Sequence, residues 1–220
     1  MKIDKCIRTN RKTLALVVNE NAELIVRAPK RMPMREIEAF VREKEAWIMK
    51  QQNRMKALPK KPRREYRDGE TFLFLGEPFV LKIEEETKNV AFSDGCLYLP
   101  YTQRDRAEKA VKQWYKAEAQ RILCERVREL EALTGLQSAG LRVTFAKTRW
   151  GSCTAKNTLN FTARLIMAPS PVIDSVVAHE LCHTVHHNHA NAFWKLLYSI
   201  LPDYKRRHQW LMDHQREMEL

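Results

Sequence analysis

The first hydrophobic pattern is an alternation over residues 13–29, TLALVVNENAELIVRAP. Two apolar, β-type segments, 13–18 and 23–28, flank the polar residues 19–21, and Pro29 ends the unit. This arrangement is typical of two short strands joined by a turn. We therefore predict that a β-hairpin opens the chain.

The spacing becomes helical over residues 34–56. The apolar positions that keep this spacing are Ile37, Phe40, Val41, Trp47, Ile48 and Met55. They predict one amphipathic helix. The next segment, KALPKKPRREYR, places Pro59 and Pro62 among lysines and arginines, which is typical of a connector.

The middle of the chain changes from strand patterns to a helix pattern. TFLFLGEPFVLKIE and NVAFSDGCLYLP predict short strands, with turns at Gly76-Glu77 and at Asp94-Gly95. Residues 103–133 are polar with regularly spaced apolar positions, which predicts one long helix or two abutting ones. Gly135 is the expected helix stop.

The C-terminal part again mixes strands with a helix. LRVTFAK predicts a strand, RWGSC a tight turn, and TLNFTARLI a second strand in which apolar and polar residues alternate. Behind Pro171, a stripe at four-residue spacing predicts a helix with one buried face; its members are Ile173, Val177, Leu181 and Val185. These elements divide the chain into a β-rich region over 1–102, with one amphipathic helix and a basic connector, and a second domain over 103–220.

Composition and charge restrict the classes of protein. The 220 residues are 44% apolar, enough for a packed core. Most of the net charge of +12 comes from the N-terminal part of the chain, because residues 1–67 carry 19 Lys/Arg against 8 Asp/Glu. No apolar run is long enough to span a bilayer, the N-terminus lacks the apolar core of a signal peptide, and the five cysteines form no CxxC pair. These features predict a cytoplasmic protein with reduced thiols and no membrane partner.

The candidate chemistry lies in HELCHTVHHNH, residues 179–189, which holds five of the seven histidines. At 100° per residue, His179, His183 and His186 fall within about 60° of one another on a helix, with Glu180 beside them. This is the HExxH arrangement, in which both histidines bind zinc and the glutamate is the general base.

A catalytic zinc site needs a third protein ligand. His186 lies about 10 Å along the helix axis from His179, so the three side chains would not form a tetrahedral face. The following segment, residues 190–200, contains no acid. His189, which a turn through residues 187 and 188 would return to the ion, is the expected ligand; His186 and His187 are expected outside the ligand set.

Other reactive side chains near the motif have plainer interpretations. Cys153 and Cys182 are expected to be small packing residues rather than reactive thiols. Phe193 and Trp194 are expected to pack behind the site.

Several of these motifs together resemble a known family. HELCHTVHHNHANAFW, followed by LPDYKRRHQWL and preceded by KTRWGSC and APSPVIDSVV, is similar to the YgjP-like metallopeptidase family, and the resemblance extends over nearly the whole chain. The HELCH core and the basic charge also resemble, more distantly, the SprT-like proteases that act on DNA-bound proteins. One departure is His186, which stands where many zinc peptidases have glycine, so the helix exit must use ordinary backbone angles.

The resemblance implies a zincin-like α+β catalytic domain. It implies zinc held by His179, His183 and His189, and a metal-bound water activated by Glu180 to hydrolyse a peptide or protein. Zincins usually pair an extended substrate with an edge strand before the active-site helix, and TLNFTARLI, which contains Asn160, occupies that place. Arg149 is either a partner for the developing oxyanion or a structural residue of its turn.

Two further functions remain open at this stage. One is a metal-dependent hydrolase of nucleotides or phosphate esters, and the other is a nucleic-acid-binding module with structural zinc. Both would use the basic residues 50–67, where eight Lys/Arg stand against one acid. Such a segment attracts nucleic acid in a salt-dependent manner.

Overall fold

A computed structural model describes residues 2–19, 21–57 and 64–220. The chain forms two compact units, Met1–Lys60 and Lys61–Leu220. The sequence pattern had placed a boundary between residues 102 and 103. That point lies inside the second unit, because strands on one side of it share a hydrophobic core with the long helix on the other side.

The first unit contains the predicted hairpin. Strands β2 (Ala15–Val18) and β3 (Leu24–Pro29) pair antiparallel, with Val17 opposite Ile25, which confirms the prediction. A further strand, β1 (Lys5–Thr9), pairs parallel to β3 and gives the order β1-β3-β2. KCIRT shows no clear alternation, so the sequence pattern did not indicate β1.

The prediction of one helix over 34–56 was wrong. The structure has α1 (Met34–Glu43) and α2 (Glu45–Ala57), separated at Lys44, whose φ is −96° and ψ 11°. The residues around the break, 42–45, are all charged, so no apolar contact holds a straight helix there. Apolar side chains on both sides of the break still reach one core; they are Ile37, Val41 and Ile48.

The basic segment 50–67 divides into three parts. Residues 50–57 belong to α2, and 58–63 lie outside the described residues. Arg64 is held within the second unit: its Nη1 donates to the Thr71 carbonyl at 2.7 Å, its Nε to the Glu219 carbonyl at 3.0 Å, and its guanidinium lies 4.4 Å from the centre of the Phe72 ring. Arg64 therefore has a structural role and is not a freely exposed cation for nucleic acid.

The second unit begins with a four-stranded sheet. Its strands are β4 (Thr71–Phe74), β5 (Glu77–Glu84), β6 (Ala91–Ser93) and β7 (Cys96–Pro100), in the order β4-β5-β7-β6. The first turn is at Leu75-Gly76 rather than Gly76-Glu77, because Glu77 already begins β5. Gly76 has φ +91°, and a Cβ there would lie 2.8 Å from the Pro169 side chain. The turn thus docks closely on the chain that leads into the helix carrying the HExxH motif.

A three-stranded sheet lies next to that helix. It consists of β8 (Gly140–Thr144), β9 (Gly151–Cys153) and β10 (Thr158–Thr162), in the order β8-β10-β9. The predicted tight turn RWGSC was wrong, since its last three residues form edge strand β9. The predicted strand 158–166 was too long: β10 ends at Thr162, and residues 163–167 form the short 3-10 helix η2 (Ala163–Met167), which is buried throughout.

Buried Arg164, in η2, fixes the loop before β9. Its guanidinium donates to the Lys147 carbonyl at 3.0 Å and forms an ion pair with Glu219 at 3.0 Å. It also lies 5.0 Å from the centre of the Trp150 ring. The alternating pattern had suggested an outward polar side chain at this position; instead, Arg164 connects the loop, the C-terminus and η2.

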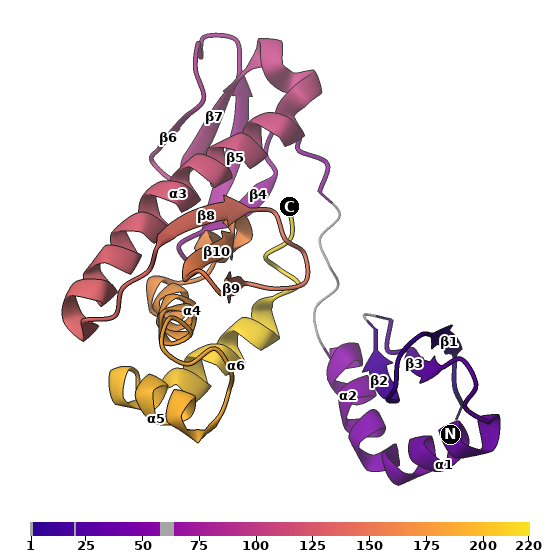
Figure 1. The fold of residues 1–220 in the computed structure, drawn as a ribbon. Coiled ribbons are helices and arrows are strands. Elements are labelled where there is room, and N and C mark those ends of the chain that lie inside the picture. The colour runs from indigo at the N-terminus through magenta and orange to yellow at the C-terminus, as the bar shows by residue number, and fades with distance from the viewer. Residues whose placement is uncertain (1, 20, 58–63) are drawn as a thin grey trace. The chain divides into compact units, whose positions relative to one another are not determined.

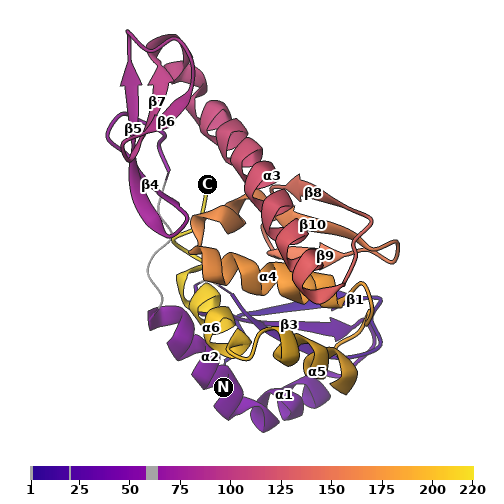
Figure 2. The same cartoon turned by 90° about the vertical axis from the view of Figure 1, so that its left-hand side faces the viewer.

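Helices complete the second unit. They are η1 (Tyr101–Arg106), α3 (Ala107–Thr134), α4 (Ser170–Cys182), α5 (Asn191–Ile200) and α6 (Tyr204–His214). As Figures 1 and 2 show, α3 runs from the four-stranded sheet to the three-stranded one. It ends at Gly135, whose φ of +74° supports the predicted stop. Two hydrogen bonds of 2.6 Å join Arg126 on α3 to Asp174 on α4 and connect these two helices.

The α+β class implied by the family resemblance is confirmed, since the described residues form helices and three sheets. Among these residues, no helix has both the length and the apolar character needed to cross a membrane.

Candidate metal centre

The end of α4 determines where the histidines lie. Ile173, Val177 and Leu181 are buried, as the four-residue stripe predicted, but α4 ends at Cys182 and Val185 is 55% exposed. The chain then turns, and the His186 N–H donates to the Cys182 carbonyl at 3.0 Å. No residue from 183 to 189 has a positive φ, so the helix exit uses ordinary backbone angles, as expected without a glycine.

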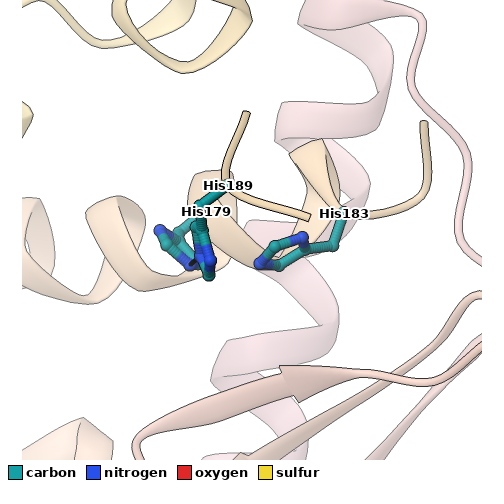
Figure 3. A group of neighbouring side chains, drawn as sticks. All are labelled: His179, His183 and His189. Atoms are coloured by element: carbon teal, nitrogen blue, oxygen red, sulfur yellow. Dashed lines mark hydrogen bonds between the residues drawn. The ribbon is translucent and has the colours of Figure 1, made fainter. Parts of the chain in front are cut away.

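The turn brings His189 back to the two helix histidines. Figure 3 shows the rings of His179, His183 and His189 facing one another. One ring nitrogen from each lies within 4.8 Å of the others, and the Nε2 atoms of His179 and His189 are 3.1 Å apart. The three residues expected as ligands are therefore together, and within the described part of the chain no other group of histidine, cysteine or acidic residues converges in this way.

Two of the three rings have a partner on Nδ1. His183 Nδ1 lies 2.9 Å from the His186 carbonyl, and His179 Nδ1 lies 3.1 Å from the hydroxyl of Tyr204. These contacts leave Nε2 of both rings to face the centre. His186 contributes its backbone carbonyl to this contact, and its side chain is not part of the converging group.

The donor set fits a divalent ion of the zinc type. Zinc binds histidine nitrogen at about 2.0–2.1 Å in tetrahedral geometry, so two such ligands lie about 3.3 Å apart. The 3.1 Å between the Nε2 atoms of His179 and His189 is close to this spacing. Three neutral nitrogen ligands also leave one coordination position open, as catalytic sites require.

The surroundings keep the rings of His179 and His183 neutral. Burial, reinforced by the neighbouring histidines, lowers the pKa of His179 to about 3, and burial also lowers the pKa of His183. Phe193 is fully buried and stacks on the His183 ring with centroids 4.5 Å apart, and Trp194 stacks on His189 at 5.7 Å. A neutral imidazole is the form that binds metal, so the site is prepared for an ion at physiological pH.

Glu180 follows His179 on the last turn of α4 and lies against strand β9. The residue is 6% exposed, and burial raises the pKa of its carboxyl group to about 7, while the charge of Arg149 and a hydrogen bond from the Cys153 backbone act in the lowering direction. A carboxylate with a pKa near the working pH is suited to accept and return a proton.

Gly151 makes room for this carboxylate. A Cβ at residue 151 would lie 2.6 Å from both Cγ and Oε1 of Glu180, far inside van der Waals contact. Glycine in this strand is thus required by close approach, which is one of the two usual reasons for glycine in a strand.

Replacing Gly151 with alanine should therefore displace Glu180. We expect hydrolysis to fall by at least about 10²-fold, because the base loses its position, while metal binding by the three histidines is kept. Steady-state kinetics and metal analysis of the same preparation measure the two effects. Wild-type kinetics in Gly151→Ala would refute the assigned position of Glu180.

The edge of the three-stranded sheet that borders Glu180 is β9, not β10. The expectation that TLNFTARLI is the substrate-pairing edge is contradicted, because β10 lies between β8 and β9. The Thr162 N–H donates to the Trp150 carbonyl, and Ser152 stands opposite Asn160. In an antiparallel ladder, hydrogen-bonded residue pairs alternate with pairs that are not hydrogen-bonded. Because Trp150 is hydrogen-bonded to Thr162, the backbone groups of Gly151 and Cys153 point away from β10.

Arg149 and Asn160 line a single cavity of about 400 Å³ beside β9. Asn160 projects from the middle of the sheet and donates to the Ser152 carbonyl at 3.4 Å. Arg149 is exposed, and its charge reaches Glu180. Their contact with substrate remains a prediction.

A smaller cavity of about 150 Å³ borders the centre directly. Its lining residues are Trp150, Gly151, Val176, His179, Glu180, Tyr204, His208 and Leu211. The sequence interpretation missed Gly151, Tyr204 and His208. A glycine within a predicted turn was a weak signal of close backbone approach; nothing in the spacing of Tyr204 or His208 connects them to HExxH.

The two nearby cysteines have raised pKa values. Burial raises the pKa of Cys182 to about 12, and burial followed by the charge of Glu180 raises that of Cys153. Because the thiolate is the reactive form, both environments disfavour reactive thiols. Cys182 is fully buried, in agreement with a packing role.

Comparison with known proteins decides the family. The sequence profile of the YgjP-like family, described as a metallopeptidase domain, matches residues 12–214. The chain belongs to the YgjP-like family. As a member of this metallopeptidase family it is a hydrolase that uses a divalent metal and acts on peptide or protein substrates.

Other comparisons add less to the YgjP-like assignment. No curated protein matches the chain. Among solved structures, the metallopeptidase zymogen of Pyrococcus abyssi abylysin is 17% identical with a TM-score of 0.39, covering 43% of this chain and 96% of that one. The zymogen of Methanocaldococcus jannaschii jannalysin is 15% identical with a TM-score of 0.37, covering 41% and 93%.

Proposed function

We propose that this YgjP-like protein is a zinc peptidase in which His179, His183 and His189 hold the ion and Glu180 is the general base. The observation that carries the proposal is the convergence of three imidazoles within 4.8 Å, beside a buried carboxyl group, that of Glu180, whose pKa is raised to about 7. Few other chemistries need this combination.

When bound, a zinc ion lowers the pKa of a coordinated water toward 7 and polarises the substrate carbonyl. Glu180 would accept a proton from the attacking water through its carboxylate and would then donate that proton to the leaving amine. The hydrogen bond from the Cys153 backbone and the contact with Gly151 hold the carboxylate in place through both transfers.

An extended peptide would lie along the free edge of β9. The outward backbone groups of Gly151 and the Cys153 carbonyl would provide hydrogen-bonding partners for its main chain, as in other cases of strand addition, while the Cys153 N–H stays with Glu180. Alternate side chains of such a peptide would face the cavity lined by Arg149 and Asn160. Arg149 would contact the substrate there, and its charge favours an ionised Glu180.

The proposal predicts cleavage that depends on the metal. Zinc-loaded full-length protein, incubated with a mixed peptide library and followed by mass spectrometry, should generate new termini. A chelator should abolish the cleavage, and added zinc should restore it. Hydrolysis of nucleotides or phosphate esters without any peptide cleavage would contradict the proposal and support the phosphate-ester alternative.

A further inference from the structure

The Tyr204 hydroxyl is in contact with the proposed metal centre from a separate helix. Tyr204 is the first residue of α6, 7% exposed, and its oxygen lies 3.1 Å from His179 Nδ1. The phenol ring is nearly parallel to the imidazole, with centroids 5.7 Å apart and 21° between the planes. The contact therefore includes both a hydrogen bond and ring packing.

The direction of this hydrogen bond follows from the arrangement of the three rings. His179 Nε2 faces His189 Nε2 at 3.1 Å, so Nε2 is the atom placed to bind an ion. A neutral imidazole that binds through Nε2 carries its proton on Nδ1. His179 Nδ1–H must then donate, and the Tyr204 oxygen accepts.

His183 has an equivalent partner of a different kind. Its Nδ1 faces the His186 carbonyl at 2.9 Å, an acceptor supplied by the backbone of the same turn. For His179, the acceptor comes from a side chain in a helix 25 residues further along the chain. Only the second of these acceptors can be removed by a side-chain substitution.

Tyr204 is held in place by contacts at the start of α6. Arg207 Nη1 donates to the Pro171 carbonyl at 2.9 Å, near the beginning of α4, and Arg207 Nε pairs with Asp203 at 2.9 Å. The Tyr204 N–H donates to the Leu201 carbonyl at 3.1 Å. The hydroxyl is thus presented by a helix that is tied to α4, the helix that carries His179.

We propose that Tyr204 is a positioning residue that fixes the tautomer and ring orientation of His179 and so strengthens metal binding. This inference rests on the proposed zinc centre. Partners of this kind on metal-binding histidines typically contribute 10- to 100-fold in metal affinity.

The test is the zinc affinity of Tyr204→Phe, measured by competition with a chelator, with zinc ion alone as the probe. Phenylalanine keeps the ring packing and removes only the oxygen, so zinc should bind about 10- to 100-fold more weakly. Tyr198→Phe is the matched control, because Tyr198 is a neighbouring tyrosine whose ring contacts Tyr204 but not the histidines. It should bind zinc as the wild type does.

A second measurement reports the hydrogen bond itself. In nuclear magnetic resonance spectra of the zinc-loaded wild type, the Nδ1 proton of His179 should be protected from exchange and show a nuclear Overhauser effect to the Tyr204 ring. The signal should be lost or shifted in Tyr204→Phe and unchanged in Tyr198→Phe. A purely structural role for Tyr204 would not move it.

The outcomes separate this inference from the function on which it rests. If the wild type binds zinc and Tyr204→Phe binds it equally well, or if His179 carries its proton on Nε2, the role of Tyr204 is refuted and the centre stands. If the wild type itself binds no zinc, the proposed centre fails and the role of Tyr204 fails with it.

Discussion

Glu180→Gln is expected to retain the fold and the metal and to lose hydrolysis by about 10²- to 10⁴-fold, the usual contribution of a general base. The amide has nearly the same shape as the carboxylic acid but cannot accept the water proton. Glu180 is not among the three converging metal ligands, so metal content should remain at the wild-type level. Turnover of a cleaved peptide and metal analysis of the same sample give the result.

The control for this variant is Glu86→Gln, which changes an exposed acid in a surface bend. It should leave turnover unchanged. Wild-type turnover by Glu180→Gln would exclude Glu180 as the base. Parallel loss of metal and activity would instead indicate that the substitution had disturbed α4, which circular dichroism and thermal unfolding would reveal.

Replacing His179, His183 or His189 with alanine should have the second large effect. Each substitution removes one of three nitrogen ligands, so zinc retained after dialysis should fall from about one per chain to near zero, and activity with it. Elemental analysis of dialysed protein measures the loss. Retention of full zinc by His189→Ala would overturn the choice of third ligand.

The same motif supplies matched controls for the ligand variants. His187 is exposed, and His186 acts through its backbone carbonyl, which alanine keeps. His186→Ala and His187→Ala should therefore both retain about one zinc per chain. Loss of zinc from either variant would show that the ligand set is not the three converging rings.

The local part of the site could be predicted because it depends on helix geometry and one short turn. Two histidines one turn apart must share a face of a helix, and the glutamate between them must lie beside that face. The return of His189 followed from the same kind of reasoning, since a six-residue separation from His183 leaves little choice of path. The structure places these residues together, and zinc as the ion that they hold is a proposal.

The parts that could not be predicted depend on contacts between distant segments. Strand β9 was taken for a turn because three residues show no periodicity, and its pairing with β10 became visible only in the sheet. Gly151 and Tyr204 acquire their roles from Glu180 and His179, which lie 29 and 25 residues away in sequence. No spacing rule within one sequence connects such pairs.

The failed element boundaries have a similar cause. The helix over 34–56 was predicted as continuous from apolar spacing, which does not register a break at charged residues 42–45. Arg164 fitted an outward position in an alternating strand, but η2 replaces the strand there and buries the guanidinium against carbonyl groups and Glu219. In both cases packing overrode the local pattern.

The most direct test of the zinc peptidase assignment is the coordination sphere of zinc in the purified, reconstituted chain, measured by X-ray absorption at the zinc edge. The account predicts three imidazole nitrogens at about 2.0–2.1 Å and an oxygen from solvent, the pattern of an open catalytic site. A sulfur ligand at about 2.3 Å, or four protein ligands with no solvent oxygen, would contradict it and indicate a structural zinc.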